Sequence, residues 1–516
     1  MFYIKSIMNA SKEIYKTILI LFLYCCQYFT VLCCNCCPSC KGNSTTSSSS
    51  RQEGYSNVPD DPEVNTHCGG NNNKNIHSVT TNKKNIYPTE VQDTNINDTN
   101  HYDIKTNITS IEQEFNQPPL IGLKNVGATC YMNATLQCFL NLKKFINYFK
   151  YKVNYDLIKN IKSKRNPNLT ESFKYLIENV WLTPGNNYIL PKYISQNANN
   201  QYFIPTKFKE KISKMNPIFQ GAQANDSKDL VNFLIMTLHE ELNRAKKINN
   251  ANSSNLLINQ SDLNSVLENF VENFKNENMS LISDLFYAMN DNVTECSICH
   301  DKKYNFQIYF FLNFPLEEVR KFKIQRLVEQ FSQSNQNLFM MNQNLFMMNQ
   351  NLFQQNLSML QNNLNNTINS VNLDDCFIYN QKIEEFSGQN AMYCNTCKGT
   401  TNSYYRTLLS TGPEILVIVL NRGKGIEFKV KCEFVPQLNL YNYIERNDTG
   451  FMYDLVGVVT HMGGSDALGH FIAACKSPID NKWYTYNDDM VFPVKNFQTE
   501  ILNYAMPYIL FYQKRA

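Results

Sequence analysis

The sequence has almost no charge imbalance and very little tryptophan. Its 516 residues carry 48 Lys and Arg against 45 Asp and Glu, which leaves a formal net charge of +3. This balance gives no reason to expect nucleic acid or another polyanion as a partner of the whole chain. There are only 2 Trp, but 43% of the residues are hydrophobic and 13% are aromatic. Much of the chain can therefore form a folded core, with a length that suits roughly three folding units or one large enzyme domain with added segments.

The sequence also lacks the evenly spaced cysteine framework that staples small secreted domains. Seven of its 17 Cys lie between Cys25 and Cys40, and the other ten are scattered from Cys68 to Cys475. The scattered group includes two C-x-x-C pairs. This distribution predicts a reducing compartment, in which thiols are available for metal binding or catalysis.

Two segments are poor candidates for a packed core. Residues 41–117 are rich in Ser, Asn, Thr and Asp, and we predict a disordered linker there. Residues 331–370 contain a seven-residue repeat that reads NQNLFMM, NQNLFMM and NQNLFQQ. The period would suit a short helix, but Asn and Gln fill most of the other positions. We therefore interpret this segment as a low-complexity insertion.

The rest of the chain has the patterns of mixed structure. Residues 226–245 (DSKDLVNFLIMTLHEELNRA) have apolar side chains at helical spacing and many good helix formers. Residues 414–420 (EILVIVL) and 454–460 (DLVGVVT) are β-branched runs of strand length. Helical and strand patterns are segregated along the chain, which predicts an α+β enzyme fold.

Cys130 is the first candidate for chemistry. It lies in the segment GLKNVGATCYMNATLQ (122–137), where two glycines precede it and a helix-forming sequence starts at Tyr131. The partial positive charge of a helix N-terminus stabilises a thiolate, which is the nucleophilic form of cysteine. A cysteine at such a position is more often only a small buried residue. The functional interpretation therefore requires a base elsewhere in the chain.

Histidine is scarce, and this narrows the search for that base. Of the seven His, three lie in the predicted linker, one lies in the helix predicted at 226–245, and one adjoins a C-x-x-C pair. The remaining two, His461 and His470, flank the loop MGGSDALG between strand-like runs. A returning strand, WYTYNDD, could bring Asn487 or Asp488 beside His470. A Cys with a distant His and an Asn or Asp is typical of thiol proteases.

Two long segments resemble the signature boxes of the ubiquitin-specific protease family of deubiquitinating enzymes. They are GLKNVGATCYMNATLQ and YDLVGVVTHMGGSDALGHFIAACKSPIDNKWYTYNDDMV, in the order that the family has them. The similarity runs from about Pro119 to Arg515, so we expect a catalytic domain over 118–515. The resemblance implies an α+β, papain-like cysteine protease core with a palm, a thumb and zinc-ribbon-like fingers, preceded by a disordered N-terminal region.

The same resemblance assigns expected roles to five residues. Cys130 would be the nucleophile, and His470 would be the general base that takes its proton and later protonates the leaving amine. Asn487 matches the residue that orients the imidazole, and the adjacent Asp488 could share or replace that role. Asn125 matches the side-chain donor of the oxyanion hole.

Asp226 and Asp229 match acidic positions that would bind the arginines in the C-terminal tail of ubiquitin. Capping of the predicted helix at its N-terminus is an equally good explanation for both. This chain also departs from the family pattern without losing a reacting group, at Leu468 and Gly469 before the histidine, at Phe471 after it, and at Asn225.

Two C-x-x-C pairs, CSIC and CNTC, form a candidate metal site. They are separated by 94 intervening residues and consist of Cys296, Cys299, Cys394 and Cys397. Four thiolates suit a tetrahedral Zn²⁺ with a structural role, because they leave no open coordination position. The resemblance implies that these pairs lie in the fingers. No organic cofactor is expected, since acyl transfer through a thiolate needs none.

The resemblance implies a deubiquitinase that hydrolyses the isopeptide or peptide bond after the C-terminal glycine of ubiquitin, through a thioester acyl-enzyme. Its partners would be ubiquitin and ubiquitinated proteins, with no nucleic acid. Two alternatives remain open. One is a catalytically weak ubiquitin-binding protein tethered to a membrane, and the other is a protease for another ubiquitin-like modifier.

The N-terminal segment 1–40 contains an apolar run of 17 residues at 18–34, followed by clustered cysteines. A cleaved signal peptide is disfavoured because no small-residue cleavage site follows. A membrane span is possible, but lysines precede the run and the next basic residue is Lys41, so the rest of the chain would enter the lumen, away from ubiquitin conjugates. We favour a segment whose cysteines are S-acylated, which would attach a cytoplasmic protein to the cytosolic face of a membrane.

Acylation predicts a membrane association that thioester chemistry can reverse. The full-length protein should fractionate with membranes, and hydroxylamine, which cleaves thioesters, should release at least part of it. Replacing the seven clustered cysteines with Ser should make the protein largely soluble, because two or more acyl chains are needed for stable attachment. A protein that stays bound through both treatments and resists carbonate extraction would instead span the bilayer.

Overall fold

In the computed structural model the chain forms two units, residues 1–98 and residues 99–516. All residues that it describes belong to the second unit, and the statements below concern them alone. The predicted segment 1–40 and residues 41–109 of the predicted linker lie outside the described residues. The described ranges are 110–162, 168–182, 194–197, 200–245, 263–340, 343–423, 429–445, 451–463, 469–504 and 506–515.

The folded chain begins before the expected boundary at residue 118. Ser110 caps the short helix α2 (Ile111–Glu114), and the side chains of Ile111 and Phe115 are buried. The Phe115 ring packs edge-on against Trp181, with 5.2 Å between ring centroids. The expectation of a linker that extends to residue 117 is therefore wrong for its last residues. Two apolar side chains four positions apart bury enough surface to order this turn.

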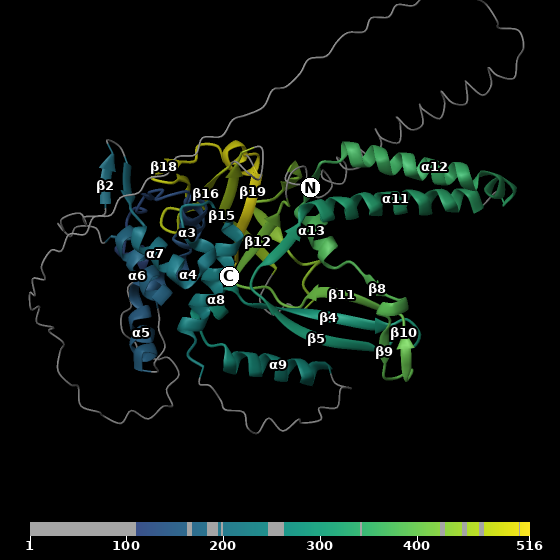
Figure 1. Cartoon of the computed structure of the whole chain (residues 1–516), viewed down its shortest axis with the longest axis horizontal. Coiled ribbons are helices and arrows are strands. Elements are labelled where there is room, and N and C mark those ends of the chain that lie inside the picture. The colour runs from purple at the N-terminus through teal and green to yellow at the C-terminus, as the bar shows by residue number, and fades with distance from the viewer. Residues whose placement is uncertain are drawn as a thin grey trace, which may run out of the picture. The chain divides into compact units, whose positions relative to one another are not determined.

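A layer of helices lies beside the central sheet (Figure 1). The helices expected after Cys130 and over 226–245 are confirmed as α3 and α8. The layer consists of α3 (Cys130–Phe139), α4 (Lys143–Tyr151), α5 (Val153–Lys162), α6 (Asn168–Val180), α7 (Thr206–Met215), α8 (Ser227–Leu242) and α10 (Leu281–Phe286).

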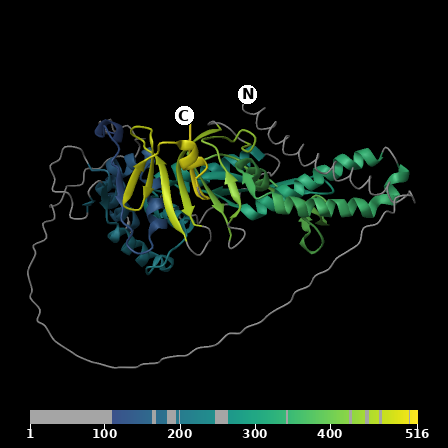
Figure 2. The same ribbon diagram turned by 90° about the horizontal axis from the view of Figure 1, so that it is seen from above.

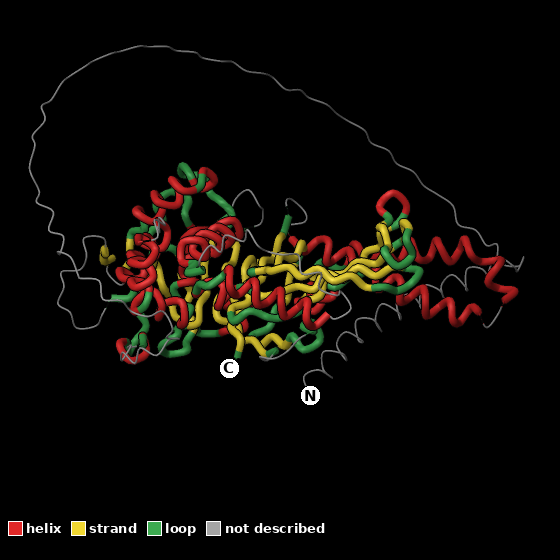
Figure 3. The backbone as a smooth tube through the Cα atoms, turned by 90° about the horizontal axis from the view of Figure 1, so that it is seen from below, coloured by secondary structure: helices red, strands yellow, loops and turns green. Residues whose placement is uncertain are grey.

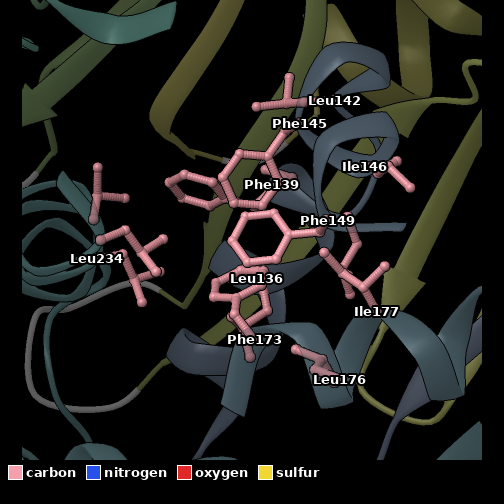
Figure 4. Close-up of a cluster of buried hydrophobic side chains, with 14 of the residues drawn as sticks. Leu136, Phe139, Leu142, Phe145, Ile146, Phe149, Phe173, Leu176, Ile177 and Leu234 are labelled. Atoms are coloured by element: carbon pink, nitrogen blue, oxygen red, sulfur yellow. The ribbon is translucent and has the colours of Figure 1, made fainter. Parts of the chain in front are cut away.

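The core between helices and sheet is centred on α3, in which all ten residues are buried. The Phe139 ring, near the end of this helix, packs against aromatic rings from three other helices and one strand. The centroid distances are 5.5 to 6.2 Å, to Phe145, Phe173, Phe286 and Phe511. Figure 4 shows Phe139, Phe145 and Phe173 close together among the helices, and their rings are tilted or edge-on to one another. The first residue of α3 is thus held on a closely packed support.

The central sheet has eight strands, seven of them in the order β18-β17-β16-β15-β19-β12-β6, and β14 pairs with β15. Only β12 and β6 are parallel neighbours; the other pairs are antiparallel. The yellow strands lie side by side in Figure 2. The strands are β6 (Leu312–Pro315), β12 (Ile415–Asn421), β14 (Gln437–Asn439), β15 (Met452–Met462), β16 (His470–Lys476), β17 (Trp483–Asn487), β18 (Met490–Pro493) and β19 (Met506–Lys514).

Strand β12 explains the apolar run at 414–420. Ile415, Val417 and Val419 belong to the core cluster on the helical side of the sheet. The intervening residues Leu416, Ile418 and Leu420 belong to a second cluster on the opposite face. Since alternate residues of a strand face opposite sides, a strand buried on both faces has no polar positions. The two strands predicted from β-branched runs are confirmed as β12 and β15.

A second, four-stranded antiparallel sheet projects away from the helical layer of α3 to α8 (Figure 1 and Figure 3). Its order is β5-β4-β11-β8, and a two-stranded hairpin, β9 and β10, lies near its tip. Helix α9 packs against β5, with the rings of Phe270 and Phe306 5.5 Å apart. The elements are α9 (Leu263–Glu277), β4 (Ala288–Cys296), β5 (Lys302–Tyr309), β8 (Glu384–Phe386), β9 (Met392–Cys394), β10 (Gly399–Thr401) and β11 (Ser403–Leu409).

The repeat segment, predicted as a low-complexity insertion whose period would suit a short helix, is mostly helical in its described residues. It lies within α11 (Leu316–Met340) and α12 (Gln343–Thr367), which pack against each other side by side (Figure 1). In the described part of α12, Leu360 is buried, whereas Met359 is 63% exposed. A narrow apolar seam is enough to pair two helices, although most of their other positions are Asn or Gln.

Smaller elements complete the unit. They are a three-stranded sheet of β1 (Ile121–Leu123), β3 (Asn200–Phe203) and β2 (Ile194–Asn197), a parallel pair of β7 (Ser370–Asn372) and β13 (Lys431–Glu433), helix α13 (Leu373–Asn380), and short turns at Pro217–Phe219, Gly388–Asn390 and Gln498–Leu502.

The α+β class is confirmed. The helical layer, the central sheet and the projecting sheet correspond to the thumb, the palm and the fingers that the resemblance implies. Among the residues that the structure describes, no helix combines the length and apolar character needed to cross a membrane.

Candidate active site

Cys130 is the first residue of α3 and is 6% exposed. The preceding turn takes two positive φ angles, 120° at Gly127 and 47° at Ala128. The Asn125 carbonyl oxygen Oδ1 fixes this turn by accepting hydrogen bonds from the backbone N–H of Gly127 (3.2 Å) and of Thr129 (2.9 Å). The thiol is therefore presented at a helix N-terminus by a rigid loop, as the sequence predicted.

The strand before this loop is bound to a distant turn between β17 and β18. The N–H of Leu123 donates to the carbonyl oxygen of Asp488 at 2.7 Å. A Cβ built on Gly122 would lie 2.4 Å from the carbonyl carbon and oxygen of Asp489, so only glycine allows this approach. Asp488 itself has a φ of 48°. This contact brings the residues after β17 to the segment that carries Cys130.

His470 begins β16, and its Nε2 is 2.6 Å from Oδ1 of Asn487. Hydrogen bonding to the Cys130 thiol raises the pKa of His470 to about 9 against the effect of burial, and Asn487 and the charge of Asp488 add to the rise. Since Nε2 faces Asn487, the other ring nitrogen, Nδ1, is the one that remains for Cys130. The structure thus brings together the three residues that the sequence analysis selected.

Asp488 lies on the other side of the same site. Its Oδ2 is 3.9 Å from Nε2 of His470 and accepts a hydrogen bond from Nδ2 of Asn125 at 3.0 Å. Its Oδ1 accepts a hydrogen bond from Nδ2 of Asn133 at 2.8 Å. Asp488 therefore contacts the loop before Cys130 more closely than it contacts the imidazole.

Asn133 is a site residue that the sequence analysis missed. It lies three positions after Cys130, is 2% exposed, and also donates to the carbonyl oxygen of Leu123 at 2.9 Å. Its amide thus ties α3 both to β1 and to Asp488. A signal was present in the sequence, because an Asn among the apolar residues of a helix must find polar partners when buried.

The other histidines have different surroundings. His461, on β15, is 5% exposed, and its ring packs edge-on against Phe471 at 4.8 Å. His239, on α8, contacts Oγ of Ser280 at 2.8 Å and Oδ1 of Asn278 at 3.0 Å. These contacts connect α8 to the start of α10, so His239 has a structural role away from Cys130.

Asp226 and Asp229 lie at the start of α8. Asp226 is its N-cap and accepts a hydrogen bond from the N–H of Lys228 at 2.8 Å, and its Oδ2 accepts another from the hydroxyl of Tyr508 at 2.7 Å. Burial and the charge of Asp226 raise the pKa of Asp229, whose side chain is 40% exposed. Capping is thus realised by Asp226, whereas Asp229 keeps a partly exposed carboxylate. Asn225, in the preceding loop, donates to the hydroxyl of Tyr131 at 3.3 Å.

The four cysteines of the two C-x-x-C pairs meet at the tip of the fingers. Their Sγ atoms all lie within 4.8 Å of one another, with 3.9 Å between Cys296 and Cys397 and 3.5 Å between Cys299 and Cys394. In each pair a backbone N–H lies 3.4 Å from the first sulfur. The residue after each pair, His300 or Lys398, has a positive φ, 58° or 53°. Two similar turns thus face each other, and their thiols could hold a metal ion.

The arrangement around Cys130 suits nucleophilic acyl transfer. A thiol and an imidazole in this relation can exchange a proton, and the resulting thiolate can attack a carbonyl carbon. Asn487 orients the ring through its Oδ1, and the Asn125 amide lies on the loop that precedes the nucleophile. Of the departures noted in the sequence, Leu468 lies outside the described residues, whereas Gly469 and Phe471 adjoin His470.

Comparison with known proteins identifies the relatives of this chain. The model of the family described as "Ubiquitin carboxyl-terminal hydrolase" matches residues 121–512. Ubiquitin carboxyl-terminal hydrolase 2 of Bos taurus is 23% identical over 402 residues, which are 76% of this chain and 55% of that protein. Ubiquitin carboxyl-terminal hydrolase 21 of Homo sapiens is 24% identical over 417 residues, 76% of this chain and 61% of that protein. The chain spans little more than half the length of these curated relatives.

Solved structures were also matched. One is described as the SAGA Ubp8/Sgf11/Sus1/Sgf73 DUB module bound to ubiquitin aldehyde. The match has 19% sequence identity and a TM-score of 0.48, and covers 80% of this chain and 72% of that chain.

The raised pKa of His470 gives a direct test of the site. In Cys130→Ala the pKa should fall from about 9 toward the ordinary value, because the thiol is the main cause of the rise. NMR titration of the ring resonances measures this. Cys138→Ala, which removes a buried thiol farther along the same helix, should leave the pKa of His470 unchanged. Equal pKa values in wild type and Cys130→Ala would show that the two side chains do not interact.

Proposed function

The chain belongs to the ubiquitin carboxyl-terminal hydrolase family, and on that premise we propose that it is a thiol-dependent deubiquitinase. It hydrolyses the isopeptide or peptide bond after the C-terminal glycine of ubiquitin. The observation that carries this proposal is the convergence of Cys130, at a helix N-terminus, with the His470–Asn487 pair. Its partners are ubiquitin and ubiquitinated proteins.

The reaction proceeds by two acyl transfers. The Cys130 thiolate attacks the carbonyl carbon of the terminal glycine, and the tetrahedral intermediate expels the lysine amine, which takes a proton from His470. This leaves ubiquitin as a thioester on Cys130. His470 then removes a proton from water, which attacks the thioester, releases the ubiquitin carboxylate and returns the thiol. The pKa of about 9 keeps the imidazole protonated for the first step at neutral pH.

Three side chains assist these steps. Asn487 accepts from Nε2 of His470, which directs Nδ1 toward the nucleophile. The Nδ2 group of Asn125 carries two hydrogens: one points to Asp488 and the other is available to the developing oxyanion. Loss of such a donor typically reduces the rate by about 10² to 10³. Asp488 favours the imidazolium electrostatically and holds Asn125 in place.

The acidic start of α8 binds the basic C-terminal tail of ubiquitin. Asp229 supplies a partly exposed carboxylate, and Asp226 adds negative charge beside it. Asp226 is also the N-cap of α8, so its replacement would weaken the helix as well as the binding of the tail. Asp229 is therefore the better position at which to examine tail recognition.

We also propose that the four cysteines at the fingertip bind one Zn²⁺. Zn–S bonds of about 2.3 Å in a tetrahedron place the sulfurs roughly 3.8 Å apart, and the Sγ distances of 3.5 and 3.9 Å fit this spacing. Thiolates are soft ligands that suit zinc. When bound, the ion supplies a cross-link between the two C-x-x-C turns and takes no part in hydrolysis.

The location proposed for the enzyme follows from its substrates and from its N-terminal sequence. Ubiquitin conjugates face the cytosol, and seven cysteines crowd beside the apolar run at 18–34. We therefore propose that the protein is cytoplasmic and attached by acyl chains to the cytosolic face of a membrane.

A ubiquitin probe with a C-terminal electrophile tests the catalytic assignment. Wild type should form a covalent adduct at Cys130 and hydrolyse a ubiquitin C-terminal reporter, whereas Cys130→Ala should bind ubiquitin without turnover. His470→Ala should lose most of the activity, and His461→Ala should lose less. Turnover by Cys130→Ala, or a larger loss for His461→Ala than for His470→Ala, would contradict the assignment. A matched probe built on another ubiquitin-like modifier measures selectivity.

Elemental analysis of the purified full-length chain tests the metal. One zinc per chain is expected, and Cys394→Ser with Cys397→Ser should release it and unfold the fingers, because metal binding contributes directly to folding free energy. Cys376→Ala removes the cysteine that lies between the two pairs in the sequence, and zinc should stay. A wild-type zinc content near zero would rule the site out.

A further inference from the structure

The ring of His461 lies against the backbone of Gly469, the residue that precedes His470. A Cβ built on Gly469 would come 2.0 Å from both Cε1 and Nε2 of His461 and 3.0 Å from its Nδ1. Carbon atoms of real side chains never approach this closely, so a larger residue at 469 would displace either the ring or the chain. The edge of the His461 ring thus limits where the backbone of Gly469 can lie at the start of β16.

His461 also contacts the residue that follows His470. Its ring packs edge-on against Phe471, with 4.8 Å between centroids, and Phe471 packs in turn against Tyr508 at 5.4 Å. In the pairing of β15 with β16, His461 lies opposite Phe471 and Met462 lies opposite His470. One buried ring therefore contacts both chain neighbours of His470.

The electrostatic surroundings keep this ring neutral. Burial lowers the pKa of His461, and the nearby charges of Arg422 and His470 lower it further, while Asp226 opposes them. A neutral His461 ring can pack near a protonated His470 without charge repulsion. His461 is thus suited to fix the position of His470 and unsuited to exchange protons with it.

We propose that His461 is a positioning residue for the reaction proposed above: it clamps Gly469 and Phe471 so that the imidazole between them reaches both Cys130 and Asn487. This inference rests on the proposed function for its kinetic consequences. The geometry of the clamp does not depend on that function, so it can also be measured without turnover.

A double-substitution cycle separates this role from general stability. His461→Ala should lower kcat about 10-fold to 100-fold and leave KM within about twofold, because a small misplacement of a catalytic group reduces the rate without removing substrate contacts. Gly469→Ala should lower kcat at least as much, because its new methyl group meets the ring. In the double variant the methyl group has space. The kcat of the double variant should therefore lie near that of His461→Ala, far above the value expected if the two losses multiplied.

Leu455→Ala is the matched control, since Leu455 lies on the same strand and is 2% exposed. It should lower the thermal midpoint of unfolding with little change in the kcat of the folded protein. If His461→Ala does not fold, His461→Asn takes its place in the cycle. Full additivity of the two losses, or an unchanged kcat in the His461 variant, would overturn the clamp.

NMR titration supplies the readout that is independent of turnover. In His461→Ala, the pKa of His470 should fall from about 9, because the His470 imidazole no longer keeps its hydrogen bond with Cys130. In Leu455→Ala the pKa of His470 should stay at about 9. If the wild-type protein proves inactive toward ubiquitin, the proposed function fails, and this titration alone decides on the clamp: a pKa of His470 unchanged in His461→Ala would refute it.

Discussion

The backbone contact between β1 and the turn after β17 is the constraint on which the site depends. The hydrogen bond from Leu123 to Asp488 and the close approach of Gly122 to Asp489 join two segments that are more than 360 residues apart in the sequence. The first segment continues into the loop of Cys130, and the second immediately follows Asn487. Without this contact, Asn487 would have no fixed relation to Cys130, and Asn125 would lose its hydrogen bond with Asp488.

Packing behind the site makes that relation rigid. Helix α3 lies across β16, and the sulfurs of Cys138 and Cys475 are 3.8 Å apart in a region without solvent. Gly457, on the adjacent strand, leaves the space that the sulfur of Cys138 occupies. Cys130 and His470 therefore lie at the starts of two elements whose buried faces are in direct contact, so that close packing couples their positions.

Local patterns in the sequence predicted the elements that carry the chemistry, and long-range contacts decided the rest. The β-branched run of β12 and the periodicity of α8 are properties of a few adjacent residues, so both could be recognised directly. The helix after Cys130 was predicted from its helix-forming residues, and the proximity of His470 to Asn487 or Asp488 was predicted from the returning strand WYTYNDD. The resemblance to the signature boxes then implied their roles. The partners of Asn133 and the contact of His461 with Gly469 could not be anticipated, because they are determined only when distant strands pair. The pairing of α11 and α12 could not be recognised from the sequence, because a single polar helix has only a weak apolar pattern. Its few apolar side chains are buried only when it packs against the second helix.

The fingertip cysteines have a consequence for the length of the chain between them. Strands β4 and β11 are paired over seven residue pairs, and the two C-x-x-C turns meet at the tip, so both ends of the intervening 94 residues are held close together. The entropy lost in closing such a loop grows only with the logarithm of its length, and each doubling costs roughly 0.6 kcal/mol. The helical hairpin of α11 and α12, which begins directly after β6 and is followed by β7, can therefore be accommodated at little thermodynamic cost. New surface can thus be added after the edge strand β6 while the two C-x-x-C turns stay together at the fingertip.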